Sequence, residues 1–158
     1  MVRKQGLFIR LAVLGLAFAS GPVLADDPVK NILDEEVPAL KDGSTISLAD
    51  REKAIGDACR RRGFAPTVVS PGVIEGRYGN PGRWFTVTIT HSATAYSLHY
   101  KDSHRMDYNA ARNRIDDYYN EKVAGLAEHI EADFERALKR MKADQKQARK
   151  VAKEAAKA

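Results

Sequence analysis

The tripeptide Asp102-Ser103-His104 contains the three residue types of a serine-hydrolase triad. A triad aligns a hydroxyl, an imidazole and a carboxylate in series, and adjacent residues of one short segment cannot easily reach that arrangement. The chain also lacks the Gly-x-Ser-x-Gly pattern that presents a nucleophilic serine in many hydrolases. We therefore interpret the tripeptide as a polar segment between a strand and a helix, and we rank a small hydrolase third among the functions considered.

His91 and His99 suggest a shared metal ion at first sight. In the strand pattern described below, His91 falls on the apolar face of a sheet and His99 on the opposite face, so one ion cannot bind both. The sequence adds no cysteine cluster and no His-x-x-x-His spacing. We expect no metal site and no cofactor.

Acidic residues gather along the polar side of a predicted long helix: Asp116, Asp117, Glu128, Glu131, Asp133 and Glu135. Glycoside hydrolases hold two carboxylates across a cleft, whereas one convex helix presents its carboxylates to solvent. The glycines at 72, 76, 79 and 82 precede no Gly-Lys-Ser/Thr, so they do not indicate a phosphate-binding loop. The sequence thus predicts no catalytic residue and favours a protein that is not an enzyme.

Two helices and a sheet are expected to position these residues. The first helix should begin at Ser47, where Ser47 and Asp50 form a capping pair, and end at Gly63. Ile55 and Cys59 lie on its apolar side. Cys59 is the only cysteine, so it is either buried or paired between chains, and its place on the apolar side favours burial.

Residues 66–101 change to an alternating pattern, which turn signals at Pro71-Gly72, at residues 79–82 and at residues 92–95 divide into four strands. The expected pairs are Val69 with Ile74, Ile74 with Val87, Val87 with Tyr100, and Ile89 with Leu98. Paired residues share a face. One face therefore collects Val69, Ile74, Phe85, Val87, Ile89, Leu98 and Tyr100. The other face collects polar residues together with Val68, Val73 and Trp84.

A long second helix is predicted to begin near Asn109 or Ala110. Its apolar residues recur every three or four positions, as Ile115, Tyr119, Val123, Leu126, Ile130, Phe134, Leu138 and Met141. The first half should cover the sheet, and the second half should run past its edge. If Phe134, Leu138 and Met141 stay exposed there, we expect a homodimer through this strip. The predicted fold class is α+β: a four-stranded antiparallel meander with a helix before it and a long helix after it, packed on one face.

Residues 1–25 have the composition of a secretory signal peptide. Arg3 and Lys4 precede an apolar run, and Val23-Leu24-Ala25 suits signal peptidase. The run is shorter than the roughly 20 residues that a membrane-spanning helix needs. We expect cleavage after Ala25, a mature chain without a transmembrane segment, and no nucleic-acid partner. Because Asp26 and not cysteine follows the cleavage point, we expect no lipid anchor there.

The mature chain divides into three regions by composition. Residues 26–45 form an acidic lead-in that we expect to be partly disordered, residues 46–138 form the α-ββββ-α domain, and residues 139–158 form a Lys/Ala-rich tail, helical or disordered. The leader accounts for +3 of the formal charge of +5 and the tail for +6, so residues 26–138 carry −4. Our second functional hypothesis is that this basic tail contacts anionic lipid or polymer in the envelope.

Three segments carry a resemblance to known proteins: residues 71–76 (PGVIEG), residues 96–103 (YSLHYKDS), and Asp107-Tyr108-Asn109 with Tyr118-Tyr119-Asn120. They resemble a widespread group of small bacterial envelope proteins, many of them described as lipoproteins. The similarity runs from about Ile46 to Ile130. It implies a helix–four strands–helix fold and a bacterial periplasm, and it implies no activity, because the group has none assigned. This chain departs from many members in lacking the lipid-attached cysteine.

The solvated face of the sheet is the candidate binding surface, formed by Arg77, Trp84, Thr86, Thr88, His99 and Lys101. Aromatic and arginine side chains are the usual anchors of protein interfaces. The alternative for Trp84 is that it covers the sheet edge or packs against the lead-in. Our first hypothesis is therefore a non-enzymatic periplasmic protein that acts as a structural accessory of the envelope or binds an envelope protein or polymer.

Overall fold

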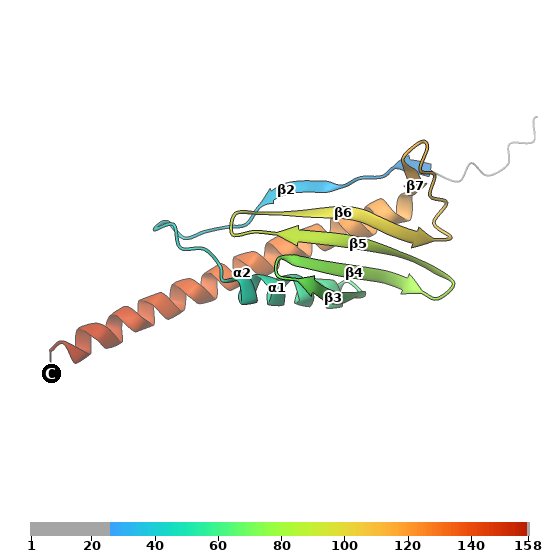
Figure 1. Cartoon of the computed structure of the whole chain (residues 1–158). Helices are drawn as coiled ribbons and strands as arrows, with labels where there is room; N and C mark the ends of the chain where they lie inside the picture. The colour runs from blue at the N-terminus through green and yellow to red at the C-terminus, as the bar shows by residue number, and fades with distance from the viewer. Residues whose placement is uncertain (1–25, 158) are drawn as a thin grey trace, which may run out of the picture.

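The computed structural model describes residues 26–157, and the predicted signal peptide lies outside this range. A five-stranded antiparallel sheet forms one layer, and both helices pack against the same side of it (Figure 1). The strands are β2 (Ile32–Glu36), β3 (Phe64–Ser70), β4 (Val73–Asn80), β5 (Arg83–His91) and β6 (Ala95–His104), in the order β2-β6-β5-β4-β3. The helices are α1 (Leu48–Arg61) and α2 (Asp117–Ala155), and β1 (Asp26–Pro28) pairs with β7 (Arg114–Asp116) in a separate ladder. The α+β class is confirmed, but the sheet has one strand more than expected.

The start of α1 is the capping pair that the sequence predicts. Ser47 Oγ accepts a hydrogen bond from the backbone N–H of Asp50 at 3.1 Å, and it donates one to Asp50 Oδ2 at 2.6 Å. These bonds satisfy one of the free N–H groups of the first helical turn. The helix ends at Arg61, and Gly63 follows with φ of +79°, a conformation that glycine adopts without steric cost.

The predicted register is confirmed between β5 and β6 and wrong between β4 and β5. Val87 pairs with Tyr100 and Ile89 with Leu98 as expected, but Ile74 pairs with Ile89 in place of Val87. The difference arises because β4 continues through Gly79 (φ +113°) to Asn80, which leaves a two-residue turn where four residues were expected. A shift of two residues keeps every side chain on its face, so the apolar face survives the error.

The β3–β4 register also differs from the expected one. Ser70 pairs with Val73 but Val68 pairs with Ile74, so Val69 forms a bulge. Val68 and Val69 are 57% and 55% exposed. The expected place of Val69 on the buried face is therefore wrong, because an extra residue in one strand interrupts the alternation at the end of this edge strand.

The acidic lead-in provides the additional strands. β2 pairs with β6 and lies at the sheet edge, and a bulge between Ile32 and Glu35 contains Asp34 with φ of +54°. The four residues from Leu33 to Glu36 are exposed. An edge strand bonds a neighbour on one side only, so it tolerates the charged residues that made this segment look unstructured.

The helix α2 begins later than predicted. Asp116 caps it by accepting a hydrogen bond from the N–H of Tyr118 at 2.9 Å. The preceding residues 105–116 form a loop and β7, with Arg105, Asp107 and Asn113 at positive φ. Ile115 is fully buried, but it belongs to the strand β7 and not to the helix. Ile115 is spaced from Tyr119 as in a helix only by coincidence. Residues 114–116 pair with β1 and therefore form a strand.

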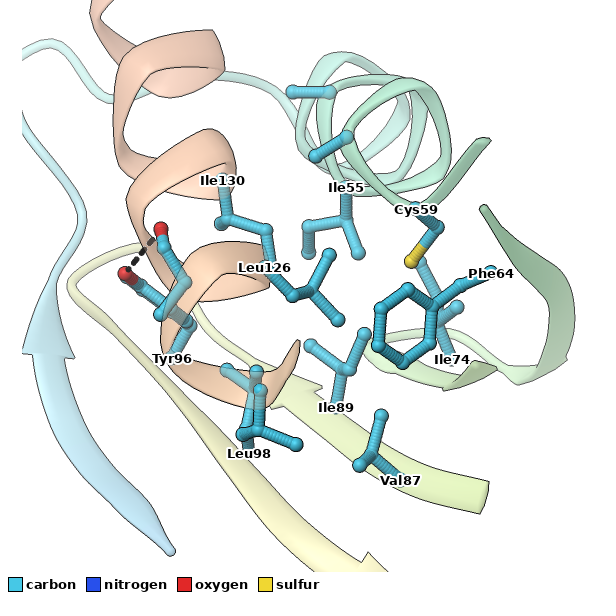
Figure 2. Close-up of a cluster of buried hydrophobic side chains, with 14 of the residues drawn as sticks. Ile55, Cys59, Phe64, Ile74, Val87, Ile89, Tyr96, Leu98, Leu126 and Ile130 are labelled. Atoms are coloured by element: carbon cyan, nitrogen blue, oxygen red, sulfur yellow. Dashed lines mark hydrogen bonds between the residues drawn. The ribbon is translucent and has the colours of Figure 1, made fainter. Parts of the chain in front are cut away.

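The core lies between the sheet and the two helices (Figure 2). Ile74, Phe85, Val87, Ile89 and Leu98 face it from the strands, and the α2 stripe faces it with Tyr119, Val123, Leu126, Ile130 and Phe134. Cys59 is fully buried among these residues, as predicted, and burial raises the pKa of its thiol to about 12. Neither α1 nor α2 is long and apolar enough to cross a membrane.

Candidate functional site

The structure places all six predicted surface residues on the outer face of the sheet, opposite the helices. Alternation fixes this arrangement, because Phe85, Val87 and Ile89 point into the core and their neighbours on β5 point away. Arg77 lies on β4, Trp84, Thr86 and Thr88 lie on β5, and His99 and Lys101 lie on β6. No helix covers this side of the sheet in residues 26–157 (Figure 1). We call it the outer face.

Trp84 forms a stack with side chains from the two neighbouring strands. The guanidinium carbon of Arg77 lies 4.0 Å from the centre of the indole, and the ring of His104 stacks with it at a centroid distance of 6.3 Å and an angle of 23°. A guanidinium over an indole gains cation–π attraction of about 0.5–1 kcal/mol at an exposed site. These contacts favour one orientation of the half-buried Trp84 on the outer face. Trp84 lies on β5, which β4 and β6 flank, and its ring contacts Arg77 and His104 of those two strands.

A second feature of the outer face is an ion pair that crosses β5. Lys101 Nζ lies 2.6 Å from Glu75 Oε1, and Lys101 occupies the bulge where the β5–β6 register shifts. Thr86 is only 8% exposed, whereas Thr88 and His99, which pair with each other, are partly exposed. The short threonine side chains of β5 thus lie in the middle of this face, and longer side chains from β4 and β6, such as Glu75 and Lys101, extend beside them.

The triad-type residues do not assemble. All three lie within β6, which extends to His104 and not into the polar connection expected there. Asp102 pairs with Thr86 and His104 with Trp84, both on the outer face. Ser103 pairs with buried Phe85, and its hydroxyl lies 2.9 Å from the hydroxyl of Tyr100. Because Ser103 alternates with its neighbours, its hydroxyl cannot reach the His104 imidazole on the other side of the strand.

The two histidines of the metal hypothesis lie on opposite faces of the sheet. His91 is 9% exposed on the core side, and His99 pairs with Thr88 on the outer face. Within residues 26–157, no three His, Cys, Asp or Glu side chains are grouped closely enough to hold a metal ion. The pKa of His91 is lowered by burial and secondarily by the positive charge of Arg51. A neutral imidazole is therefore the favoured form at this position.

One acidic residue of α2, Asp133, is buried, although the acidic residues of this helix were expected to face solvent. Asp133 is 5% exposed and lies between the guanidinium groups of Arg61 on α1 and Arg136 on α2, with Arg136 Nε at 2.8 Å from its Oδ1. The pair with Arg61 joins the two helices, whereas the pair with Arg136 lies within α2. The expectation of a solvated carboxylate is wrong here because the arginine run at the end of α1 lies against α2.

Apart from the outer face, the structure has a groove of about 890 Å³ between residues 39–42 and the C-terminal half of α2. We call it the basic groove. Its α2 side runs from Glu135 to Lys153. Seven of its lining residues are lysine or arginine, and two are acidic. The sequence indicated the basic charge of this region, but not that a turn of the lead-in lies opposite the helix.

Comparison of the chain with protein-family models, with curated proteins and with solved structures finds no match. Its function must therefore be inferred from the geometry of its own residues.

Proposed function

We propose that this protein is a non-enzymatic binding protein of the bacterial envelope that engages a partner through the outer face of its sheet. The observation that supports this most is the stack of Arg77, Trp84 and His104 on a face that neither α1 nor α2 covers. Tryptophan and arginine are enriched among the residues that dominate interface energies. Fixing the indole before binding lowers the entropy that its ordering would otherwise cost.

The composition of this face favours a macromolecule over a small molecule. Thr86 and Thr88 of β5 form its middle, and the Glu75–Lys101 pair and the Arg77–Trp84–His104 stack lie beside them. Small-molecule sites are concave and mostly apolar, whereas protein interfaces contain about ten hydrogen bonds and a polar rim beside their aromatic and arginine anchors. We therefore propose a protein or polymer of the envelope with a polar contact surface.

The test compares two variants that each carry two alanine substitutions. Arg77→Ala with Trp84→Ala removes the stack, and Arg140→Ala with Val151→Ala removes one basic and one exposed apolar side chain from the far part of α2. Both proteins, and the unchanged chain, are immobilised and exposed to a detergent extract of the envelope. We expect partners to be lost with the first variant and kept with the second. Identical partner lists for the two variants would refute a role for the outer face.

The proposed location rests on the composition of residues 1–25 and needs its own experiment. Export predicts that the protein recovered from cells begins at Asp26 and lies in the periplasmic fraction. Intact-mass measurement of the protein from fractionated cells decides the matter. A chain that begins at Met1 in the cytosolic fraction would overturn the periplasmic assignment and leave the outer-face experiment unaffected.

A further inference from the structure

The basic groove is formed where α2 leaves the sheet. Leu126, Ile130 and Phe134 are fully buried against the core, and Leu138, one turn later, is partly buried against it. The same side of the helix continues with Lys142, Gln145 and Arg149, which line the groove. The stripe that is apolar under the sheet therefore becomes basic beyond it. Figure 1 shows this half of α2 extending past the sheet edge, with the lead-in loop beside it.

A turn of the lead-in forms the opposite wall of the groove. The turn is closed by hydrogen bonds of 2.9 Å from Leu40 N to Ser44 O and from Gly43 N to Leu40 O. It reaches α2 at Gln145, whose amide nitrogen lies 3.4 Å from Ser44 Oγ, and at Arg149, 4.0 Å from Asp42. A C-terminal helix end that was only solvated would not contact the lead-in turn, whereas this one does at Gln145 and Arg149. The groove therefore has two sides that are connected by specific contacts.

The lining combines an apolar interior with a positively charged rim. Ala39, Leu40 and Leu138 contribute aliphatic carbon, and the stems of Lys142 and Lys146 add to it. Lysine side chains bury their methylene stems along apolar surface and keep the ammonium group in water. The rim has a charge excess of five, because seven basic residues outnumber Asp42 and Glu135. This arrangement is complementary to a ligand with an apolar body and an anionic end.

We propose that the basic groove binds the acyl chain of a single-chain anionic lipid, with its carboxylate at the ammonium groups of Lys142 and Lys146. Charge complementarity at the rim selects the anionic end, and the aliphatic walls select the chain. A polyanion without a chain would gain from the lysines but nothing from Leu40. The proposal concerns a different surface from the outer face and does not depend on it.

The first experiment measures binding of a fluorescent long-chain fatty acid, cis-parinaric acid, to the purified chain. We expect saturable binding that unlabelled palmitate displaces. Lys142→Glu with Lys146→Glu should weaken the affinity at least tenfold. Lys30→Glu with Arg140→Glu changes the net charge equally at exposed positions outside the groove, and it should change the affinity less than twofold. Absence of saturable binding, or equal effects of the two pairs, would overturn the proposal.

The second experiment separates a lipid site from a merely charged surface. Leu40→Asp places a carboxylate on the aliphatic wall and should weaken binding at least tenfold, whereas Leu33→Asp, at an exposed position of β2, should have little effect. Circular dichroism establishes that each variant is folded, and the lysine variants carry the test alone if Leu40→Asp does not fold. Displacement of the probe by polyphosphate as effective as by palmitate would assign the surface to polyanions. Equal displacement by hexadecanol would show that charge is not recognised. Either result refutes the proposal.

Discussion

The side-chain oxygen of Asn120 accepts a hydrogen bond from the backbone N–H of Lys30 at 3.0 Å, across 90 positions of sequence. The amide nitrogen of the same side chain donates to the carbonyl of Pro28, also at 3.0 Å. Asn120 is 8% exposed. One buried amide on α2 thus bonds both an acceptor at the end of β1, Pro28 O, and a donor just after it, Lys30 N.

Replacing this residue tests whether the lead-in is an integral part of the fold. Asn120→Ala removes two hydrogen bonds and leaves two backbone groups with poorer partners, which should lower the free energy of unfolding by about 1–3 kcal/mol. Urea denaturation measures the loss, and hydrogen exchange should be faster at the amides of Val29 and Lys30. Gln147→Ala, at an exposed position of α2, is the control and should be neutral. Equal stability of the two variants would contradict the role of Asn120.

The buried carboxylate of Asp133 should be a second point of sensitivity. Asp133→Asn preserves the size of the side chain but removes the charge that Arg61 and Arg136 face. Both guanidinium groups are about half exposed, so water can solvate them in the variant. We expect a loss of about 1–3 kcal/mol, smaller than the 3–5 kcal/mol seen when a fully buried pair is broken. Thermal unfolding provides the measurement, with Asp144→Asn as the exposed control. A loss below 0.5 kcal/mol, as for ordinary surface changes, would be inconsistent with this account.

The thiol of Cys59 should be unreactive in the folded protein. Its side chain is fully buried, and burial raises the pKa of the thiol to about 12, so almost no thiolate is present at pH 8. We expect DTNB to label the native protein only as fast as it unfolds, and to label one thiol per chain at once in guanidinium chloride. Non-reducing gels should show no disulfide-linked dimer. Rapid labelling of the native chain would place the thiol on the surface.

The stability of the protein should depend on the protonation of His91. Burial lowers the pKa of this imidazole, with a smaller effect from the charge of Arg51, which the opposite charge of Glu52 partly offsets. Above the unfolded pKa of about 6.5, the residue is neutral in both states and its contribution is constant. As the pH falls below that value, the unfolded chain binds the proton first, so the free energy of unfolding decreases until the folded pKa is passed.

The matching experiment compares denaturation from pH 7.5 to pH 5. His91→Gln should reduce the pH dependence of the unfolding free energy by up to about 1.4 kcal/mol per pH unit, the value for one proton. Thr88→Val, on the outer face and without a titratable group, serves as the control and should retain the wild-type slope over this window. If both variants have the wild-type slope, another group causes the loss of stability in acid.

The homodimer remains a prediction, and the structure leaves less exposed apolar surface for it than the sequence suggested. Phe134 is fully buried in the core of its own chain, and Leu138 and Met141 are partly buried. The strip that would attract a second copy is thus smaller than the spacing of apolar residues suggested. The spacing identifies which side of a helix is apolar, but not how much of that side the rest of the chain covers.

Local patterns were sufficient for much of this protein. The capping pair of Ser47 and Asp50, the buried place of Cys59 and, apart from the bulged end of β3, the two faces of the sheet followed from spacing alone. The reason is that side-chain direction repeats with the period of the helix or strand. The outer-face residues were predictable for the same reason. Even the shift of Ile74 to a different partner left its face unchanged, because the error was an even number of residues.

Contacts between distant segments decided the rest. The strand β2 carries three acidic residues and has little strand signal, yet pairing with β6 and the hydrogen bond from Asp34 N to Ser97 Oγ order it. Pairing with β1 likewise moved the start of α2 to Asp117. The basic groove needs both the lead-in turn and the far half of α2, and Gln145 and Ser44 are 101 positions apart. Periodicity along one segment describes that segment's own faces, whereas such pairings depend on the free energy of bringing two segments together.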